Sequence, residues 1–169
     1  MVSVTGLPFV NADLIAADRF GAEAMIRSHE AAEIAEATRS RLIDMGQSFI
    51  AETVASHPSK VALVRHAKDA GYVVTIHVVM IPEALAVPRV AARVAAGGHD
   101  VPPDRVIARY RRLWPLVAQM IGVADEAHIY DNSRDTRPLQ RVGRFRQGDP
   151  VSPPNWPDWT PQPLRDLTT

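Results

Sequence analysis

The residues best suited to chemistry in this chain are arginines set at helical spacing. The basic residues comprise two lysines and seventeen arginines. Within residues 103–120, three arginines spaced i, i+4 and i+7 fall on one stripe of a predicted helix: Arg105, Arg109 and Arg112. Arg89 and Arg93 share a face of the preceding helical segment, and Gly97-Gly98 joins the two segments. Such a pair can close its fixed positive charge over a polyphosphate. A solvated basic face of a helix hairpin is the alternative.

A second set of polar residues follows the predicted strands. Short apolar runs at residues 7–10, 48–51 and 127–130 are typical of strands that end in a loop. The polar residues at these ends are Asn11, Asp13, Glu52, Thr53, Asp131 and Asn132. In open sheets with helical connections, ligands bind beyond the carboxyl ends of the strands. The alternative is that polar residues simply terminate strands.

The segments between these residues predict the elements that position them. Helices are expected over residues 22–45, 58–71, 88–96 and 103–120, with a bend or interruption at Pro115. The apolar run of residues 72–80 is typical of a strand buried on both faces. Because strands alternate with helices, the pattern predicts an α/β fold with a parallel sheet covered on both faces.

Composition limits the function classes. The chain has 169 residues and 18.5 kDa, the size of one domain, and its basic and acidic residues number 19 each. This neutral balance disfavours a general nucleic-acid or anionic-membrane binder. The absence of cysteine excludes disulfides, thiolate nucleophiles and cysteine-ligated zinc. The longest apolar run is too short for a membrane span, so a cytoplasmic protein is expected.

The last twenty residues differ in character from the rest. They contain six prolines beside Trp156 and Trp159. This composition predicts a non-globular, proline-rich C-terminal tail over residues 149–169, following a domain of residues 1–148. The tail is either a docking segment anchored by its tryptophans or a frayed terminus.

Several sequence blocks, taken in order, resemble the zeta-toxin-like P-loop kinases of bacteria. The resemblance spans roughly residues 7 to 145, and its most specific parts are Glu52-Thr-Val-x-Ser-His-Pro-Ser-Lys60 and Gly97-Gly-His-Asp-Val-Pro102. The other blocks are Val10-Asn-Ala-Asp-Leu-Ile15, Ala67-Lys-Asp-Ala-Gly-Tyr72, Arg109-Tyr-Arg111 and Tyr130-Asp-Asn-Ser133.

The resemblance implies a P-loop-kinase-like parallel sheet flanked by helices. It also implies an ATP- and magnesium-dependent kinase acting on a small molecule or nucleotide sugar, with UDP-N-acetylglucosamine as the family's substrate, and an antitoxin protein as partner. No nucleic-acid or membrane partner is expected.

Residue roles carry over position by position. Asp13 matches the general base for the acceptor hydroxyl, with Asn11 beside it, and Glu52 and Thr53 match the motif that faces substrate and metal. The lid arginines that contact phosphates correspond to Arg93, Arg109 and Arg112. Asp131 and Asn132 match the loop near the nucleotide base. No metal ligand is assigned.

One departure from the family pattern is large. Residues 1–169 contain no Gly-x-x-x-x-Gly-Lys-[Ser/Thr] loop, whose amides, lysine and hydroxyl would hold phosphate and magnesium. We therefore expect a truncated domain that lacks its first strand–loop–helix unit and has impaired kinase activity. The competing function is a non-catalytic, degenerate kinase fold acting as a regulatory or toxin–antitoxin partner. Loss of a central strand further predicts a homo-oligomer, or a terminal segment that fills the gap.

Overall fold

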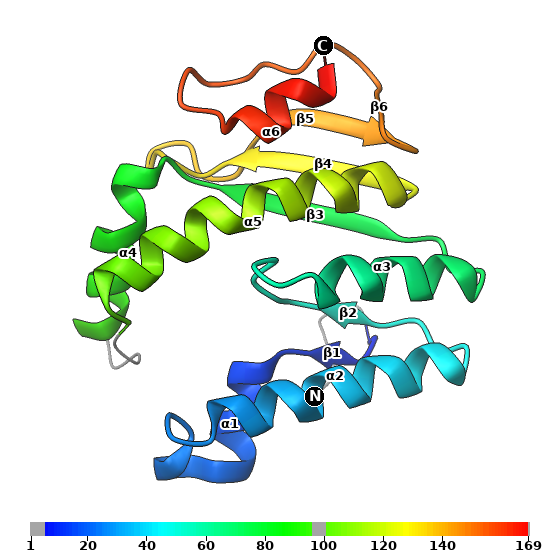
Figure 1. Ribbon diagram of the computed structural model, residues 1–169, viewed down its shortest axis with the longest axis vertical. Helices are drawn as coiled ribbons and strands as arrows, with labels where there is room; N and C mark the ends of the chain where they lie inside the picture. Colours follow the sequence, from blue (N-terminus) through cyan, green and yellow to red (C-terminus); the bar gives the residue numbers. More distant parts are fainter. Residues whose placement is uncertain (1–5, 96–100, 169) are drawn as a thin grey trace. The chain divides into compact units, whose positions relative to one another are not determined.

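A computed structural model describes residues 6–95 and 101–168 and divides the chain into two compact units, Met1–Val54 and Ala55–Thr169 (Figure 1). We call them the N-terminal unit and the C-terminal unit. The size of the chain predicts one domain, whereas the structure divides into two compact units. The boundary that composition places at residue 149 stays a prediction.

The N-terminal unit consists of a small parallel sheet and two helices. Strands β1 (Phe9–Val10) and β2 (Ile50–Ala51) pair in parallel, and helices α1 (Ala12–Phe20) and α2 (Ser28–Asp44) connect them, with a short 3-10 turn at Gly21–Glu23. Most buried side chains where α1 and α2 pack are alanines, which let the helices approach closely: Ala16, Ala31 and Ala35.

Helix α1 is an element that the hydrophobic pattern did not predict. Asn11, expected to lie in a loop, caps this helix because its Oδ1 accepts a hydrogen bond from the Leu14 amide at 3.0 Å. Gly21, with a φ of 49°, ends the helix in a conformation that few other residues adopt. The predicted helix over residues 22–45 consequently begins later, at Ser28.

The C-terminal unit contains a four-stranded sheet in the order β3-β4-β5-β6. Its strands are β3 (Thr75–Met80), β4 (Glu126–Asp131), β5 (Gln140–Arg146) and β6 (Asp149–Pro150). Its helices are α3 (Ser59–Asp69), α4 (Glu83–Ala95), α5 (Pro103–Val123) and α6 (Gln162–Arg165), and a 3-10 turn follows at Asp166–Thr168. Helix α4 begins five residues earlier than predicted, and α5 continues through Pro115 to Val123.

The sheet is parallel in part. Strands β3 and β4 are parallel, as the alternation of strands and helices predicts, while β4–β5 and β5–β6 are antiparallel. Strand β5 escapes prediction because arginines alternate with its buried residues and lower its hydrophobicity. The outcome is a mixed α/β fold whose parallel strands and flanking helices are compatible with a P-loop-kinase-like architecture.

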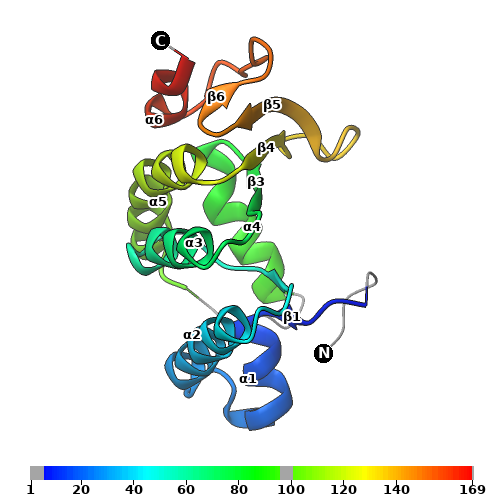
Figure 2. The same ribbon diagram turned by 90° about the vertical axis from the view of Figure 1, so that its right-hand side faces the viewer.

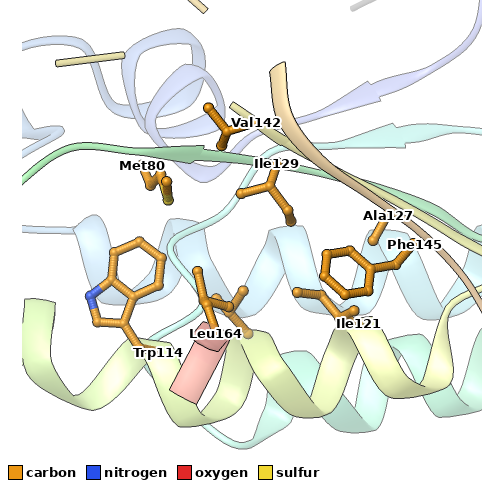
Figure 3. Close-up of a cluster of buried hydrophobic side chains, with 9 residues drawn as sticks. Met80, Trp114, Ile121, Ala127, Ile129, Val142, Phe145 and Leu164 are labelled. Carbon is orange, nitrogen blue, oxygen red and sulfur yellow. The ribbon is translucent and has the colours of Figure 1, made fainter. Parts of the chain in front are cut away.

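The core of the C-terminal unit lies between the sheet and helices α5 and α6 (Figure 3). Its largest fully buried side chains come from both layers: Phe145, Met80, Ile121, Ile129 and Leu164. Trp114 and Val117 from α5, with Ala127 and Val142 from the sheet, complete the cluster. Burial of this much apolar surface is the main term that stabilises the unit.

The proline-rich segment takes part in this core. Trp156 stacks on Phe145 with ring centroids 6.2 Å apart, and Leu164 of α6 is fully buried. The Thr160 hydroxyl donates to the Pro157 carbonyl, and Arg165 Nε donates to the carbonyl of Thr160. Composition predicts a non-globular tail for this segment. In the structure its apolar side chains, spaced between prolines, anchor it to the sheet and α5.

Candidate functional site

The ends of β1 and β2 are joined by a hydrogen bond between two residues singled out in the sequence. Asn11 Nδ2 donates to Glu52 Oε2 at 3.0 Å, while the Oδ1 atom of the same side chain caps α1. The two strands are parallel, with Val10 opposite Ala51, so the residues that follow them lie at one edge of this small sheet. Asn11 therefore fixes both the start of α1 and the position of the Glu52 carboxylate.

Asp13 lies in the first turn of α1, two residues after the cap, and its side chain is exposed. The amides at a helix N-terminus attract negative charge, and Asp13 stands in this first turn. Thr53 follows Glu52 and is also exposed. An exposed carboxylate near the end of β1 can accept a proton from an alcohol bound there.

A bidentate ion pair joins the first residue of the arginine-bearing helix α4 to the middle of α5. Arg111 Nε and its Nη2 donate to the two carboxylate oxygens of Glu83, at 2.9 and 2.8 Å. These hydrogen bonds lower the pKa of Glu83 and raise that of Arg111. Next to them, the Tyr110 hydroxyl donates to the carbonyl of Ile81 at 2.9 Å, and burial raises the pKa of Tyr110. The start of α4 is thus clamped to α5.

The predicted lid arginines differ in whether they have a hydrogen-bond partner. Arg112 Nε donates to the Ser56 carbonyl at 2.9 Å, which ties α5 to the segment before α3. Arg93, Arg105 and Arg109 are exposed and have no ion pair or hydrogen bond with another described residue. The Gly-Gly junction between the helices falls in residues 96–100, outside the described residues.

Asp131 and Asn132 hold the turn after β4. Asp131 Oδ1 accepts a hydrogen bond from the Ser133 amide at 2.7 Å. The Asn132 amide donates to the carbonyl of Met80, and its Oδ1 accepts from the Leu139 amide at 3.4 Å. Both side chains therefore shape the β4–β5 connection at the carboxyl ends of β3 and β4.

The two units divide the predicted site residues. Asn11, Asp13, Glu52 and Thr53 belong to the N-terminal unit, where one hydrogen bond brings two of them together. The arginines and the Asp131–Asn132 pair belong to the C-terminal unit. Convergence of the lid arginines on the strand ends that carry Asp13 and Glu52 stays a prediction.

The described residues contain no metal site built from several protein side chains alone. Within residues 6–95 and 101–168, no three His, Asp or Glu side chains gather closely enough to hold a metal ion. Glu52, the carboxylate assigned to face metal, already accepts a hydrogen bond from Asn11. Binding of ATP and magnesium by this chain stays a prediction.

The sequence alone does not indicate the roles of some residues in the C-terminal unit. Glu83 forms the bidentate ion pair with Arg111, yet it lies twenty-eight positions earlier in the sequence and belongs to no recognisable motif. Its position three residues after the predicted strand of residues 72–80 is the only feature of the sequence that could have indicated this role. His77, His128 and Tyr130 form a stack of rings on the sheet that becomes visible only once the strand register is known.

Comparison with known proteins places the chain in a family. In the described part of the chain, no helix has the length and apolar character needed to span a membrane. No curated protein matches the sequence. The family model described as Zeta toxin matches residues 15–140, well over half of the 169 residues, and this stretch includes α2, both arginine-bearing helices and β4. The chain belongs to the zeta toxin family.

Proposed function

We propose that this chain carries the acceptor-binding part of an ATP-dependent small-molecule kinase of the zeta toxin type, with a nucleotide sugar as the class of acceptor. Asp13 is the general base for the acceptor hydroxyl, Asn11, Glu52 and Thr53 line its binding edge, and the exposed arginines of α4 and α5 meet phosphate groups.

The observation that carries this proposal is the Asn11–Glu52 hydrogen bond at the ends of two parallel strands, with Asp13 in the adjoining helix turn. Three polar groups at one strand edge suit the recognition of a hydroxyl-rich ligand. Arg93 and Arg109 support the phosphate half of the proposal because their guanidinium groups have no partner among the described residues.

Kinase turnover by residues 1–169 alone is not expected. Phosphoryl transfer depends on positioning and charge stabilisation, much of which comes in P-loop enzymes from a phosphate-cradling loop that is absent from this sequence. The loss of one strong electrostatic donor typically costs on the order of 100- to 1000-fold in rate. ATP and magnesium belong to the proposed family activity.

A non-catalytic function is the second candidate. The sequence has no glycine-rich phosphate loop, and the described residues contain no metal-binding cluster. A degenerate kinase fold that binds its ligand without turnover, as a regulatory or toxin–antitoxin partner, retains the use of the same strand edge and arginines.

The test combines ligand binding with turnover. We expect UDP-N-acetylglucosamine to shift the amide NMR signals of residues 11–13 and 52–53, and the Asp13→Asn variant to weaken this binding. Asp18→Asn is the matched control, because Asp18 is an exposed aspartate on the same helix outside its first turn. Unchanged signals at both strand ends would contradict the acceptor site.

ATP consumption with magnesium and the same sugar nucleotide separates the two candidates. We expect the wild type and the Asp13→Asn variant to consume ATP at the same background rate. This result agrees with ligand binding without turnover. Turnover that depends on Asp13 would show that another group, with the arginines of α5 as first suspects, replaces the missing phosphate loop.

A further inference from the structure

The strand register separates two faces of the four-stranded sheet. Ile76, Val78 and Met80 of β3 face the core that α5 covers, and Figure 2 shows α3 and α5 on one side of β3 and β4. Residues in the alternate positions lie on the other face, which we call the open face. Its residues are Thr75, His77 and Val79 of β3, Glu126, His128 and Tyr130 of β4, and Arg141, Arg144 and Arg146 of β5.

Aromatic rings form a stack on the open face. The ring centroids of His77 and His128 are 5.1 Å apart with an interplanar angle of 12°, and those of His77 and Tyr130 are 5.9 Å apart at 15°. His77 Nδ1 lies 3.2 Å from the Tyr130 hydroxyl. Desolvation and the nearby His128 lower the pKa of His77 from its ordinary value of 6.5, which favours an uncharged ring at neutral pH.

This stack ends at an edge strand. Strand β3 is the edge of its sheet in the described residues, and His77 is exposed. The neighbouring Val79 is 53% exposed, unusual for a strand paired in parallel, because such strands are normally covered on both faces. A planar base can therefore extend the stack on the side of His77 away from His128.

Arginines concentrate beside the rings. Residues 134–146 contain five arginines and one acidic residue, Asp135, although the chain as a whole is neutral. On the open face, Glu126 is shared between Arg144 and Arg146, at 3.1 Å from each, and lies 3.3 Å from His128 Nε2. One carboxylate thus serves two guanidinium groups and leaves a net positive charge.

Two polar atoms in the same row of the sheet also lack partners. His128 and Arg144 stand opposite each other in the register, and His128 Nδ1 and Arg144 Nε are buried with no hydrogen-bond partner among the described residues. Buried polar nitrogens without partners are rare in folded proteins and call for an explanation. This row is therefore incomplete in hydrogen bonding.

We propose that the open face binds single-stranded nucleic acid. A four-stranded sheet with helices α3 and α5 on one side, and with aromatic rings and arginines on the other, is a layout with which proteins hold unpaired bases. The rings supply stacking, which accepts any base, and the arginines meet the phosphates. Overall neutrality, which disfavours such a partner at the level of composition, does not describe this local surface.

An acidic polypeptide is the competing occupant of a basic surface. It would use the arginines of β5 but would gain little from the stacked rings, because carboxylates have no aromatic face to lay on His77. The rings therefore favour nucleic acid, and the contribution of His77 to binding distinguishes the two occupants.

The test measures fluorescence anisotropy of a labelled twelve-nucleotide oligouridylate with the full chain at several salt concentrations. We expect His77→Ala to weaken binding by about tenfold, since one lost stacking contact typically has this size. Arg146→Gln should lower the slope of log affinity against log salt by about one. Arg65→Gln, an exposed arginine on α3, is the matched control and should leave both quantities unchanged.

Ring NMR signals of the wild type keep the proposal testable if a variant fails to fold. The oligonucleotide should shift the ring signals of His77 and Tyr130, and polyglutamate at equal charge should not displace it. The proposal is overturned if those ring signals stay unchanged, if polyglutamate competes equally, or if Arg65→Gln weakens binding as much as the open-face variants do.

Discussion

The two units of this protein differ in how their interiors are built. In the C-terminal unit, large side chains from the sheet and helices meet, among them Phe145, Met80 and Leu164, each with no exposed surface. Among the described residues of the N-terminal unit, half of the buried side chains are alanines, and the others are Val10, Ile43 and an arginine, Arg39, whose Nε lacks a partner among the described residues. The residues proposed to bind the acceptor substrate thus belong to the unit with the smaller apolar core.

This difference has a physical consequence. Stability follows the apolar area buried, so the C-terminal unit holds most of the free energy of unfolding. Regions with few buried apolar contacts open more readily, and ligand-binding segments are commonly drawn from them. A two-residue pairing between β1 and β2 adds little backbone stabilisation. We expect the strand edge of Asn11 and Glu52 to be the more adaptable part and the arginine-bearing helices the more rigid one.

The largest expected effect is the response of each unit to the same truncation. Leu164→Ala removes a fully buried side chain from the C-terminal core and should lower the free energy of unfolding by about 2–5 kcal/mol. Leu14→Ala, at a position that is 36% exposed in the N-terminal unit, should cost well under that amount. Urea unfolding followed by fluorescence measures both. Equal losses would break the comparison, and a negligible loss at Leu164 would mean that the C-terminal segment does not stabilise the core.

Hydrogen exchange compares the local stability of the two units without mutation. Amides of β4 and α5 should exchange at least about a hundredfold more slowly than those of α1 and β1, because core amides exchange only through near-global opening. Native-state exchange measured by NMR or mass spectrometry reports this ratio. Similar protection in both units would indicate that they unfold together as one cooperative body.

Asn11 allows helix capping and carboxylate positioning to be separated. Asn11→Ala removes both hydrogen bonds of this side chain and should destabilise α1 by about 1 kcal/mol. Asn11→Asp retains a capping acceptor but cannot donate to Glu52, so we expect it to preserve helix content and still weaken sugar-nucleotide binding. Circular dichroism and the ligand titration provide the two readings. If Asn11→Asp binds like the wild type, Glu52 needs no partner to be positioned.

The smallest expected effect concerns the acid stability of the C-terminal unit. Asp125 accepts hydrogen bonds from Lys68 Nζ at 2.6 Å and from the Val74 amide at 2.7 Å, and these bonds lower the pKa of its carboxyl from the ordinary value of 3.8. A lowered folded-state pKa stabilises the folded protein fully above pH 3.8, and this contribution disappears as the pH falls through that lower pKa.

Comparison of unfolding free energies at pH 6 and pH 3 tests this contribution. The wild type should lose more stability on acidification than Asp125→Asn, which cannot lose a charge at that position. Asp69→Asn, an exposed carboxylate on α3, is the control and should behave like the wild type. An identical acid response in the wild type and Asp125→Asn would show that the Lys68 contact contributes nothing to folding.

Local chemistry in the sequence accounts for several parts of this protein. Gly71, with a φ of 83°, follows α3 as expected of a glycine at a helix end, and the apolar run of residues 72–80 contains β3. These features depend on backbone preferences and apolar patterning within a few residues. The ordered motifs likewise give the family, which the match over residues 15–140 confirms.

Long-range pairing decided the rest, because it joins residues that no local pattern links. Whether residues 140–146 form a strand depends on β4 lying beside them, since the arginines between the buried residues lower the apolar signal. The packing of Leu164 depends on a core formed by residues more than forty positions earlier, such as Trp114 and Ile121. Likewise, the sequence alone indicates Asn11 and Glu52 as strand ends, but only parallel pairing of β1 with β2 brings an amide and a carboxylate forty-one positions apart within hydrogen-bond distance.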